Sequence, residues 1–361
     1  MEKHYCFVAH SYPRLSNLLG VNLTPIIVKK TITLEQVRGK TLAVDANNYL
    51  YQFLALIRTP KGISLKDSKG NITSHLMGLV SRSTRLIHDY GIKLIFVFDG
   101  RPPPLKGSEI QKRRELREKA ILEWKKALNK GDYSAAFSKA VMTSRLTKSM
   151  INDSKRLLDL LGIPYVQAIG EAEAQAAYMA IRGDVWASSS KDYDTLLFGS
   201  PVLVRYLTIS GKEFLPSKGT VRSLKPELIN LNQLLSHHKI TREQLIDLAI
   251  LIGTDFNEGV KGVGPKTALK LLETHGRLEN LPTEILSRIP QNYEDVRKIF
   301  LNPKVTPNYT LAYGDLQEKE LYNFLCNLRD FSKKRVETVV QRMKKFYSRK
   351  KQVGLETWFT S

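Results

Sequence analysis

Three apolar runs that each lead to an aspartate constrain the fold of this chain more than any other feature. They are TLAVD at residues 41–45, KLIFVFD at 93–99 and VWASSSKD at 185–192. Apolar runs of this length are typical of strands that are buried on both faces. Helical patterns follow at residues 47–57 and 73–90. Because strands alternate with helices, the sequence predicts an α/β fold with a mostly parallel, doubly wound sheet and helices on both faces.

The aspartates at the ends of these runs are expected to lie close together. The carboxyl ends of parallel strands meet at one edge of a sheet, and such sheets bind their ligands beyond that edge. The order of elements along the chain therefore brings Asp45, Asp99 and Asp192 to a common edge.

Further acids occur in similar settings. Glu171 and Glu173 lie in GEAEAQ, and Asp255 lies in GTDFNEG. Side chains two positions apart on a regular helix do not share a face, so Glu171 is expected at or just before a helix N-cap. Asp192 and Asp194 in KDYD are expected in an extended or turn segment, where alternate side chains point the same way.

A group of this many carboxylates requires cations. Two carboxylates about 4 Å apart repel by about 4 kcal/mol at an effective dielectric constant of about 20. Oxygen ligands without Cys or His favour hard ions, of which Mg²⁺ or Mn²⁺ fits best, and the chain has no EF-hand spacing for Ca²⁺. A pair of such ions can activate water and stabilise a leaving oxygen in phosphodiester hydrolysis. Each acid alone is better explained as a cap or turn residue, but the group predicts a nuclease.

The charge of the chain predicts a polyanionic partner. Lys and Arg number 56 against 35 Asp and Glu, which gives a net charge of +21 at pH 7 and favours nucleic acid. Residues 101–150 form a helix-prone insertion with 13 basic and 5 acidic residues. This segment is long enough to arch over a surface, although a solvated pair of charged helices is an alternative.

A predicted helix precedes Asp255, and a glycine-rich turn follows it. Residues 241–252 predict a helix that has Thr241 as its N-cap, and the glycine-rich turn GVKGVGPK precedes a further helix. Gly262 and Gly264 permit a tight turn whose backbone N–H groups face a phosphate, next to Lys266 at the start of the second helix. A turn of this kind is weak evidence alone, because helix C-caps also use glycine.

Other classes of protein are disfavoured. Cys6 and Cys326 are the only cysteines, too few for a disulfide framework or a zinc site. No apolar stretch approaches the roughly 18 residues of a membrane span, and the start of the chain lacks the pattern of a secretory signal. We therefore expect a cytoplasmic protein that does not contact a membrane.

Five motifs in order resemble the conserved blocks of flap endonucleases, members of the 5′-nuclease superfamily. They are VDANNYLYQFL, FVFDGRPPPLK, GEAEAQAAYMA, SSKDYDTLLFG and IGTDFNEGVKGVGPKTALKLL. The resemblance runs from about Gly20 to the C-terminus. It implies an Mg²⁺-dependent enzyme that cleaves 5′ flaps at the junction of single strand and duplex, in Okazaki fragment maturation and DNA repair, with an associated 5′ to 3′ exonuclease activity. The expected partner is branched DNA, and the expected state is a monomer.

The resemblance also implies roles for individual residues. One metal ion would be held by Asp45, Asp99, Glu171 and Glu173, and a second by Glu173 with Asp192, Asp194 and Asp255. Lys106 and Arg113 match residues that contact the scissile phosphate, and Tyr51 matches an aromatic residue that stacks on a base. The turn with Gly262, Gly264 and Lys266 matches a helix-two-turn-helix that holds duplex DNA and a K⁺ ion. Without the resemblance, a core tyrosine and a solvated Lys and Arg would be the simpler interpretation.

The resemblance suggests how the chain is divided. Chains of the family begin near the position that matches Gly20. Residues 1–19 are therefore either a real extension or the result of a start assigned too far upstream, and we expect the second. The expected parts are an N-terminal nuclease block at 20–118, the arch at 101–150, an internal nuclease block at 140–275 with the helix-two-turn-helix at 253–275, the rest of the core at 276–345, and a tail at 346–361.

The extreme C-terminus carries a separate motif. Gln352, Leu355, Trp358 and Phe359 form Q-x-x-L-x-x-W-F within residues 352–359. One helical turn places the apolar side chains together as anchors, and the motif resembles the peptide by which flap endonucleases bind the ring-shaped sliding clamp, PCNA. The alternative is a disordered end that happens to carry aromatic residues.

Two other functions stay open from the sequence. One is a 5′ to 3′ exonuclease or a repair nuclease of the same superfamily, although the repair type carries a long insertion between the positions of Asp99 and Glu171. The other is a non-catalytic DNA-binding clamp adaptor, which loss of the acids would favour.

Overall fold

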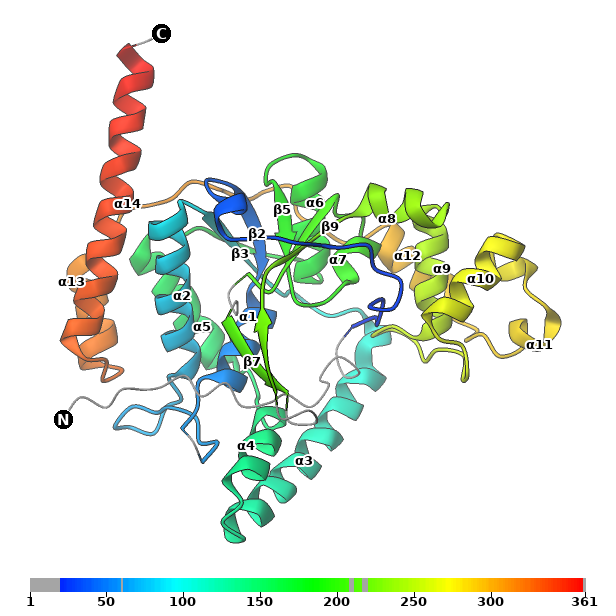
Figure 1. Ribbon diagram of the computed structural model, residues 1–361. Helices are drawn as coiled ribbons and strands as arrows, with labels where there is room; N and C mark the ends of the chain where they lie inside the picture. Colours follow the sequence, from blue (N-terminus) through cyan, green and yellow to red (C-terminus); the bar gives the residue numbers. More distant parts are fainter. Residues whose placement is uncertain (1–19, 60, 208–210, 216–219, 360–361) are drawn as a thin grey trace.

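The structure is a computed structural model that describes residues 20–59, 61–207, 211–215 and 220–359 (Figure 1). The expected extension at residues 1–19 lies outside the described residues. Side chains are described for the same ranges except 211–215, 220–224 and 350–359.

A seven-stranded sheet forms the centre of the molecule, in the order β1-β9-β6-β5-β2-β3-β4. The strands from β6 to β4 in this order run parallel, and β9 pairs antiparallel with both β6 and β1. The predicted mostly parallel α/β sheet is therefore confirmed. The strand bounds are β1 Lys30–Thr31, β2 Thr41–Asp45, β3 Lys93–Phe98, β4 Tyr165–Gln167, β5 Ala187–Ser189, β6 Val202–Arg205 and β9 Glu227–Asn230.

Helices cover both faces of the sheet because successive strand residues point to opposite sides. On β2, Leu42 and Val44 join a core with the helices of one face, whereas Ala43 joins a core with α6 on the other. The helices of the first face are α1 Ala46–Leu56, α2 Ser74–Tyr90, α5 Lys148–Leu161, α13 Glu318–Tyr322 and α14 Lys333–Phe359, and the helix of the second is α6 Ala172–Ile181.

A further group of helices packs beside β6 and β9, at the right of Figure 1. The predicted helix with Thr241 as N-cap is confirmed as α9, and Thr241 and Gln244 form a reciprocal capping box. The helices are α7 Asp194–Leu197, α8 Leu231–His238, α9 Arg242–Ile252, α10 Pro265–His275, α11 Thr283–Leu286 and α12 Tyr293–Leu301.

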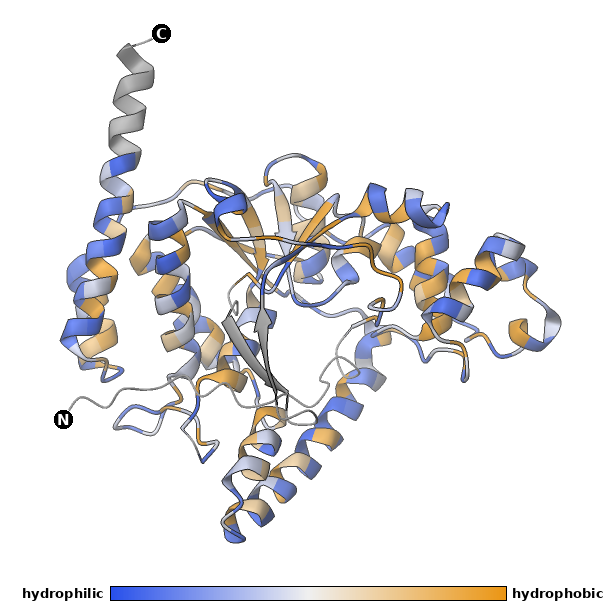
Figure 2. Cartoon of the chain, in the orientation of Figure 1, coloured by the Kyte–Doolittle hydropathy of each residue, from blue (hydrophilic) through white to orange (hydrophobic). Residues whose placement is uncertain are grey.

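The basic insertion forms a helical arm that extends away from the sheet (Figure 1). It begins with the 3-10 turn η3, Pro104–Lys106, and contains α3, Gly107–Asn129, and α4, Tyr133–Met142. Ala120 is the one buried residue of α3, and Figure 2 shows that this helix is largely hydrophilic. The two helices are joined by a turn at NKGD, where Gly131 has φ 72° and Asp132 caps α4.

Two details differ from the sequence-based expectation. The third predicted strand is reduced to β5, three residues long, because the chain bends at residues 191–193, within the KDYD segment. A separate two-stranded ladder, β7 Gly211–Leu215 and β8 Thr220–Leu224, was not predicted.

Short 3-10 or π turns occur at η2 Glu35–Val37, η5 Leu278–Asn280 and η6 Asn323–Asn327. Among the described helices, none is both long and apolar enough to span a membrane.

The packing of α1 on α2 depends on a glycine. A Cβ at Gly78 would lie 2.2 Å from Cγ of Phe53, which is buried in the core. We expect Gly78→Ala to lower the free energy of unfolding by about 1–3 kcal/mol through overpacking. Thermal unfolding would measure the change. Gly107→Ala on α3 is the matched control, since its Cβ would meet nothing within 4 Å, and it should unfold at or above the wild-type temperature. Equal melting temperatures for the two variants would contradict this packing.

Candidate active site

Parallel pairing brings the predicted acids to one edge of the sheet. Asp45 is the last residue of β2, and Asp99 directly follows β3 on one side of it. Asp192 follows β5 on the other side of β2. All three strands point the same way, so their ends meet as the sequence predicted.

The remaining acids join this edge from helix starts. Glu171 is the N-cap residue of α6, as predicted, and Glu173 lies in its first turn. Asp194 begins α7, so the KDYD segment is a bend that leads into a helix. We call the whole group the acid cluster: Asp45, Asp99, Glu171, Glu173, Asp192, Asp194 and Asp255.

Two basic residues of the arm form ion pairs with Asp255. Arg113 of α3 donates from one terminal nitrogen to both carboxylate oxygens of Asp255 at 2.8 Å. Lys106 forms an ion pair with Glu171. It forms a second ion pair with Asp255, in which Nζ lies 3.2 Å from Oδ2. The base of the arm therefore neutralises the acids that come from α6 and from the loop after α9.

Neutral donors hold three other carboxylates of the acid cluster. Asn47 Nδ2 donates to Asp99 at 2.7 Å, and Asn48 Nδ2 donates to Asp192 at 2.6 Å. Ser190 donates to Glu173 at 3.0 Å. Each donor lies two or three residues from one acid of the cluster, but the acid to which it donates comes from another segment of the chain.

The start of the described chain also reaches the acid cluster. The backbone N–H of Val21 donates to Asp194 at 3.0 Å, and that of Gly20 donates to Asp255 at 3.3 Å. A Cβ at Gly20, whose φ is 66°, would lie 3.0 Å from Asp194 Oδ1. This close approach of backbone to carboxylate favours glycine.

Burial and mutual repulsion raise the pKa values of several acids. Burial, followed by the charge of Asp99, raises the pKa of Asp45 well above its usual range. Burial and Asp194 do the same to the pKa of Glu173. Burial and Asp255 raise the pKa of Asp194 to about 7. The acid cluster thus holds more negative charge than its surroundings compensate, which is the condition that divalent cations relieve.

The arm reverses this trend at Asp255. Burial would raise the pKa of Asp255, but Lys106 and Arg113 outweigh it and the pKa is lowered. Burial works against the charge of Lys106, yet Glu171 and Asp255 raise the pKa of its ammonium group above the usual range. Both cationic side chains therefore stay charged inside the site.

The donor set fits a hard divalent cation. It consists of carboxylates, of which those of Asp45 and Asp194 are buried and that of Asp99 is exposed, and Asn47 adds an amide oxygen, Oδ1, that is buried and has no hydrogen-bond partner. In the part of the chain that the structure describes, no three of these side chains already converge closely enough to hold a metal ion. Oxygens of these acids instead accept from Lys106, Arg113, Asn47 and Asn48.

The other predicted residues lie outside the acid cluster, on α1, in the turn between α9 and α10, and at the start of α10. Tyr51 lies on α1 and is 37% exposed, so the interpretation as a core tyrosine is wrong. In the turn between α9 and α10, Gly262 has φ 88° and requires glycine's conformational freedom. Gly264 does not: it is the extended N-cap of α10, with φ −97° and free space where a Cβ would lie. Lys266 is exposed in the first turn of α10.

The predicted clamp-binding residues lie on the last turns of α14, whose backbone is helical to Phe359. The side chains of Gln352, Leu355, Trp358 and Phe359 lie outside the described residues.

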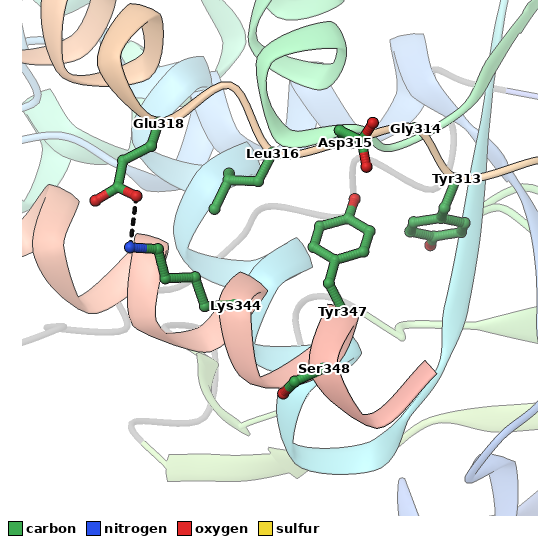
Figure 3. Close-up of a pocket in the computed structure, with 8 residues that line it drawn as sticks. All are labelled: Tyr313, Gly314, Asp315, Leu316, Glu318, Lys344, Tyr347 and Ser348. Atoms are coloured by element: carbon green, nitrogen blue, oxygen red, sulfur yellow. Dashed lines mark ion pairs between the residues drawn. The ribbon is translucent and has the colours of Figure 1, made fainter. Parts of the chain in front are cut away.

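A pocket of about 500 Å³ lies elsewhere, between residues 313–318 and α14 (Figure 3). An ion pair of Glu318 with Lys344 closes one end. The hydroxyl of Tyr347 donates to the backbone of Leu161, so it serves the fold. None of the predicted site residues lines this pocket.

Sequence reasoning missed the supports of the acids. Asn47 and Asn48 stand two and three residues after Asp45 in VDANN, and this proximity was the signal that could have identified them. The backbone donors of Gly20 and Val21 carry no signal in side-chain type, because any residue has an N–H group.

Known proteins match most of the chain. The XPG N-terminal domain matches residues 13–120, and the XPG I-region matches residues 162–255. Flap endonuclease 1 of Hyperthermus butylicus is 47% identical over 352 residues, which cover 94% of this chain and 99% of that protein.

Solved structures agree with this relationship. Flap endonuclease-1 from Methanococcus jannaschii has a TM-score of 0.74 at 40% identity and covers 92% of this chain and 100% of its own. The catalytic core of Rad2 in complex with a DNA substrate shares the fold, with a TM-score of 0.64 at 23% identity and coverage of 87% and 96%. With such identity over nearly its whole length, and with the five motifs in order, the chain belongs to the flap endonuclease family of structure-specific nucleases.

Proposed function

We propose that this protein hydrolyses one phosphodiester bond of branched DNA at the base of a 5′ flap, using a pair of Mg²⁺ ions, with Mn²⁺ as a substitute. The observation that carries the proposal is the acid cluster at the sheet edge, into which the arm inserts Lys106 and Arg113. An associated 5′ to 3′ exonuclease activity would use the same site.

The acid cluster divides naturally into two ligand sets. Asp45, Asp99 and Glu171 would hold one ion, Asp192, Asp194 and Asp255 the other, and Glu173 would serve both. The strongest repulsion on Asp45 comes from Asp99 and that on Asp194 from Asp255, in each case within one set, whereas Asp192 acts on Asp45 across the division. Bound cations of this kind supply an activated water and stabilise the leaving oxygen.

Lys106 and Arg113 would position the scissile phosphate. Their side chains already donate to carboxylate oxygens within the site, and a phosphate that enters there competes for the same donors. Arg113 also pairs with Glu109 one turn earlier on α3, which fixes its direction. Lys106 and Arg113 would therefore contact the phosphate from their positions at the base of the arm.

Other surfaces would hold the rest of the substrate. The turn with Gly262 and Gly264 would bind a phosphate of the duplex through backbone N–H groups and a K⁺ ion, next to Lys266. Tyr51, exposed on α1, would stack on a base near the cut. The catalytic core of Rad2 has the same fold and was solved in complex with a DNA substrate. This supports a branched-DNA partner for this chain.

The proposed cellular role is Okazaki fragment maturation and repair at the replication fork, in the cytoplasm, by a monomer that binds the sliding clamp through residues 352–359. Residues 20–118 and 140–275 would form the nuclease blocks and 253–275 the duplex-binding element. The arch at 101–150 would lie over the site, and residues 276–345 would complete the core. Residues 1–19 would be dispensable.

Loss of a metal ligand should separate cleavage from binding. We expect Asp99→Ala and Asp194→Ala each to slow single-turnover cleavage of a 5′ flap by at least about a thousandfold, because a cation supplies several kcal/mol of transition-state stabilisation. Flap DNA should still bind, since each change removes negative charge near phosphate. Asp295→Ala, in an exposed ion pair with Lys298, is the control and should cleave normally. Near-normal cleavage by both site variants at saturating Mg²⁺ would rule out the ligand assignment.

The stability of the metal-free protein should depend on Asp194. Its pKa is about 7 in the folded chain against an ordinary value of 3.8. Folding therefore favours the protonated form, so its contribution is fully present below about pH 4 and is lost as pH rises through 7. In EDTA we expect Asp194→Asn to be more stable than wild type at pH 8 by on the order of 2–4 kcal/mol, and equal near pH 4.

Denaturant unfolding at a series of pH values would test this. Added Mg²⁺ should stabilise wild type at pH 8 and leave Asp194→Asn less affected, because the cation offsets the same repulsion. Parallel stability curves for the two proteins from pH 4 to 8 would contradict the buried charge.

The clamp peptide should act independently of the nuclease core. Each apolar anchor that a partner buries contributes roughly 1.5–3 kcal/mol, so Trp358→Ala combined with Phe359→Ala should weaken clamp binding at least about tenfold. Cleavage without the clamp should not change. Calorimetry with the clamp is the measurement. Equal affinities would exclude this peptide as the docking site, and a loss of clamp-free cleavage would place the tail in the core.

A further inference from the structure

We propose that Arg205 is a positioning residue that fixes the segment 191–194 and so presents Asp192 and Asp194 to a metal ion. Arg205 is the last residue of β6 and is itself 6% exposed. The inference rests on the proposed function, because it assumes that these two aspartates hold a metal.

The guanidinium group of Arg205 bonds directly to the segment that carries the aspartates. Its Nε donates to the backbone carbonyl of Lys191 at 2.7 Å, and one terminal nitrogen donates to the hydroxyl of Tyr193 at 2.5 Å. These two acceptors flank Asp192. A single rigid group therefore fixes the backbone before Asp192 and the side chain between the two aspartates.

Stacking adds to these hydrogen bonds. The central carbon of the guanidinium lies 3.9 Å from the ring centroid of Tyr193 and 4.6 Å from that of Tyr206. The second terminal nitrogen donates to the Tyr206 hydroxyl at 2.9 Å. Tyr206 has φ 58°, an uncommon conformation for a bulky residue, which persists where the surroundings determine it. Arg205 is thus held by two aromatic rings as well as by its acceptors.

The sheet anchors the other side of Arg205. Its cross-strand neighbour in the β6–β9 ladder is Glu227, and the two side chains form a buried ion pair at 3.0 Å. Glu227 also pairs with Lys29 near the start of the described chain. Because the pair is part of a hydrogen-bonded ladder, the guanidinium transmits the geometry of the sheet to segment 191–194.

The start of the described chain meets the same tyrosine. The hydroxyl of Thr24 lies 3.2 Å from that of Tyr193, and the backbone N–H of Val21 donates to Asp194. Tyr193 is 4% exposed, so its ring has little room to move. Arg205 and residues 21–24 therefore constrain segment 191–194 from two sides.

Lysine cannot replace arginine in this arrangement. The planar guanidinium directs donors to four acceptors and stacks on rings at once, whereas an ammonium group is a point charge on a flexible stem. Arg205→Lys keeps the charge beside Glu227 but releases segment 191–194. The change therefore tests geometry and leaves net charge unaltered.

Metal affinity is the decisive measurement. Changes in the residues that orient metal ligands typically lower metal affinity about 10–100-fold. For Arg205→Lys we expect the Mg²⁺ concentration at half-maximal single-turnover cleavage to rise at least about tenfold, with most of the rate recovered at saturating Mg²⁺. Calorimetry with Ca²⁺, which needs no cleavage, should show a matching loss of affinity. Flap DNA binding in EDTA should not change.

Arg297→Lys provides the matched control. Arg297 also bonds a buried acid, Asp247, at 2.8 Å and a second acid, Glu279, but it lies on α12 outside the acid cluster. This variant should lose stability without any shift in Mg²⁺ or Ca²⁺ affinity. If the metal titrations of Arg205→Lys coincide with those of Arg297→Lys, Arg205 serves only the fold and the inference is overturned.

A second variant protects the test against misfolding. Glu227→Gln removes the charge that holds Arg205 while preserving shape, and it should shift both titrations in the same direction by about threefold or more. If Arg205→Lys does not fold, unchanged titrations for Glu227→Gln overturn the inference. Failure of the proposed function has a different signature, because wild type itself would then neither cleave a flap with Mg²⁺ nor bind Ca²⁺.

Discussion

Repulsion among buried carboxylates is the constraint on which the rest of this structure depends. Parallel strands deliver Asp45 and Asp99 to neighbouring positions, and the connecting segments add acids from the starts of α6 and α7. Burial raises the pKa values of Glu173 and Asp194, so the folded chain carries an unfavourable concentration of charge. Such an arrangement is stable when cations or basic side chains compensate it.

The arm supplies compensation from a distant part of the sequence. Lys106 and Arg113 reach the acids, and Lys112 pairs with Glu258 beside them in the loop after α9. The base of the arm is therefore tied both to the sheet edge and to the loop that leads to the duplex-binding turn. The residues proposed to bind the duplex and those proposed to act on the phosphate are therefore connected by ion pairs.

Local signals predicted the elements better than their supports. Apolar runs identified β2 and β3, Thr241 marked the start of α9, and spacing placed Glu171 at an N-cap. The donors that orient the acids were not predicted. Arg205 lies in the sequence SPVLVRYL, which indicates only the end of a strand. Its role depends on four acceptors, of which two lie in segment 191–194, one on β9 and one on the adjacent Tyr206.

The sequence by itself determined the α/β sheet, the set of acids and the edge at which they meet. The reason is that apolar runs mark the strands along the chain, and their alternation with helices makes the strands parallel. Only the tertiary structure decided which donor faces which carboxylate. It turned Lys106 and Arg113 onto Asp255, brought the N–H group of Val21 to Asp194, and left Tyr51 exposed. Those contacts join segments far apart in the chain, and their geometry follows from packing, which no single segment specifies.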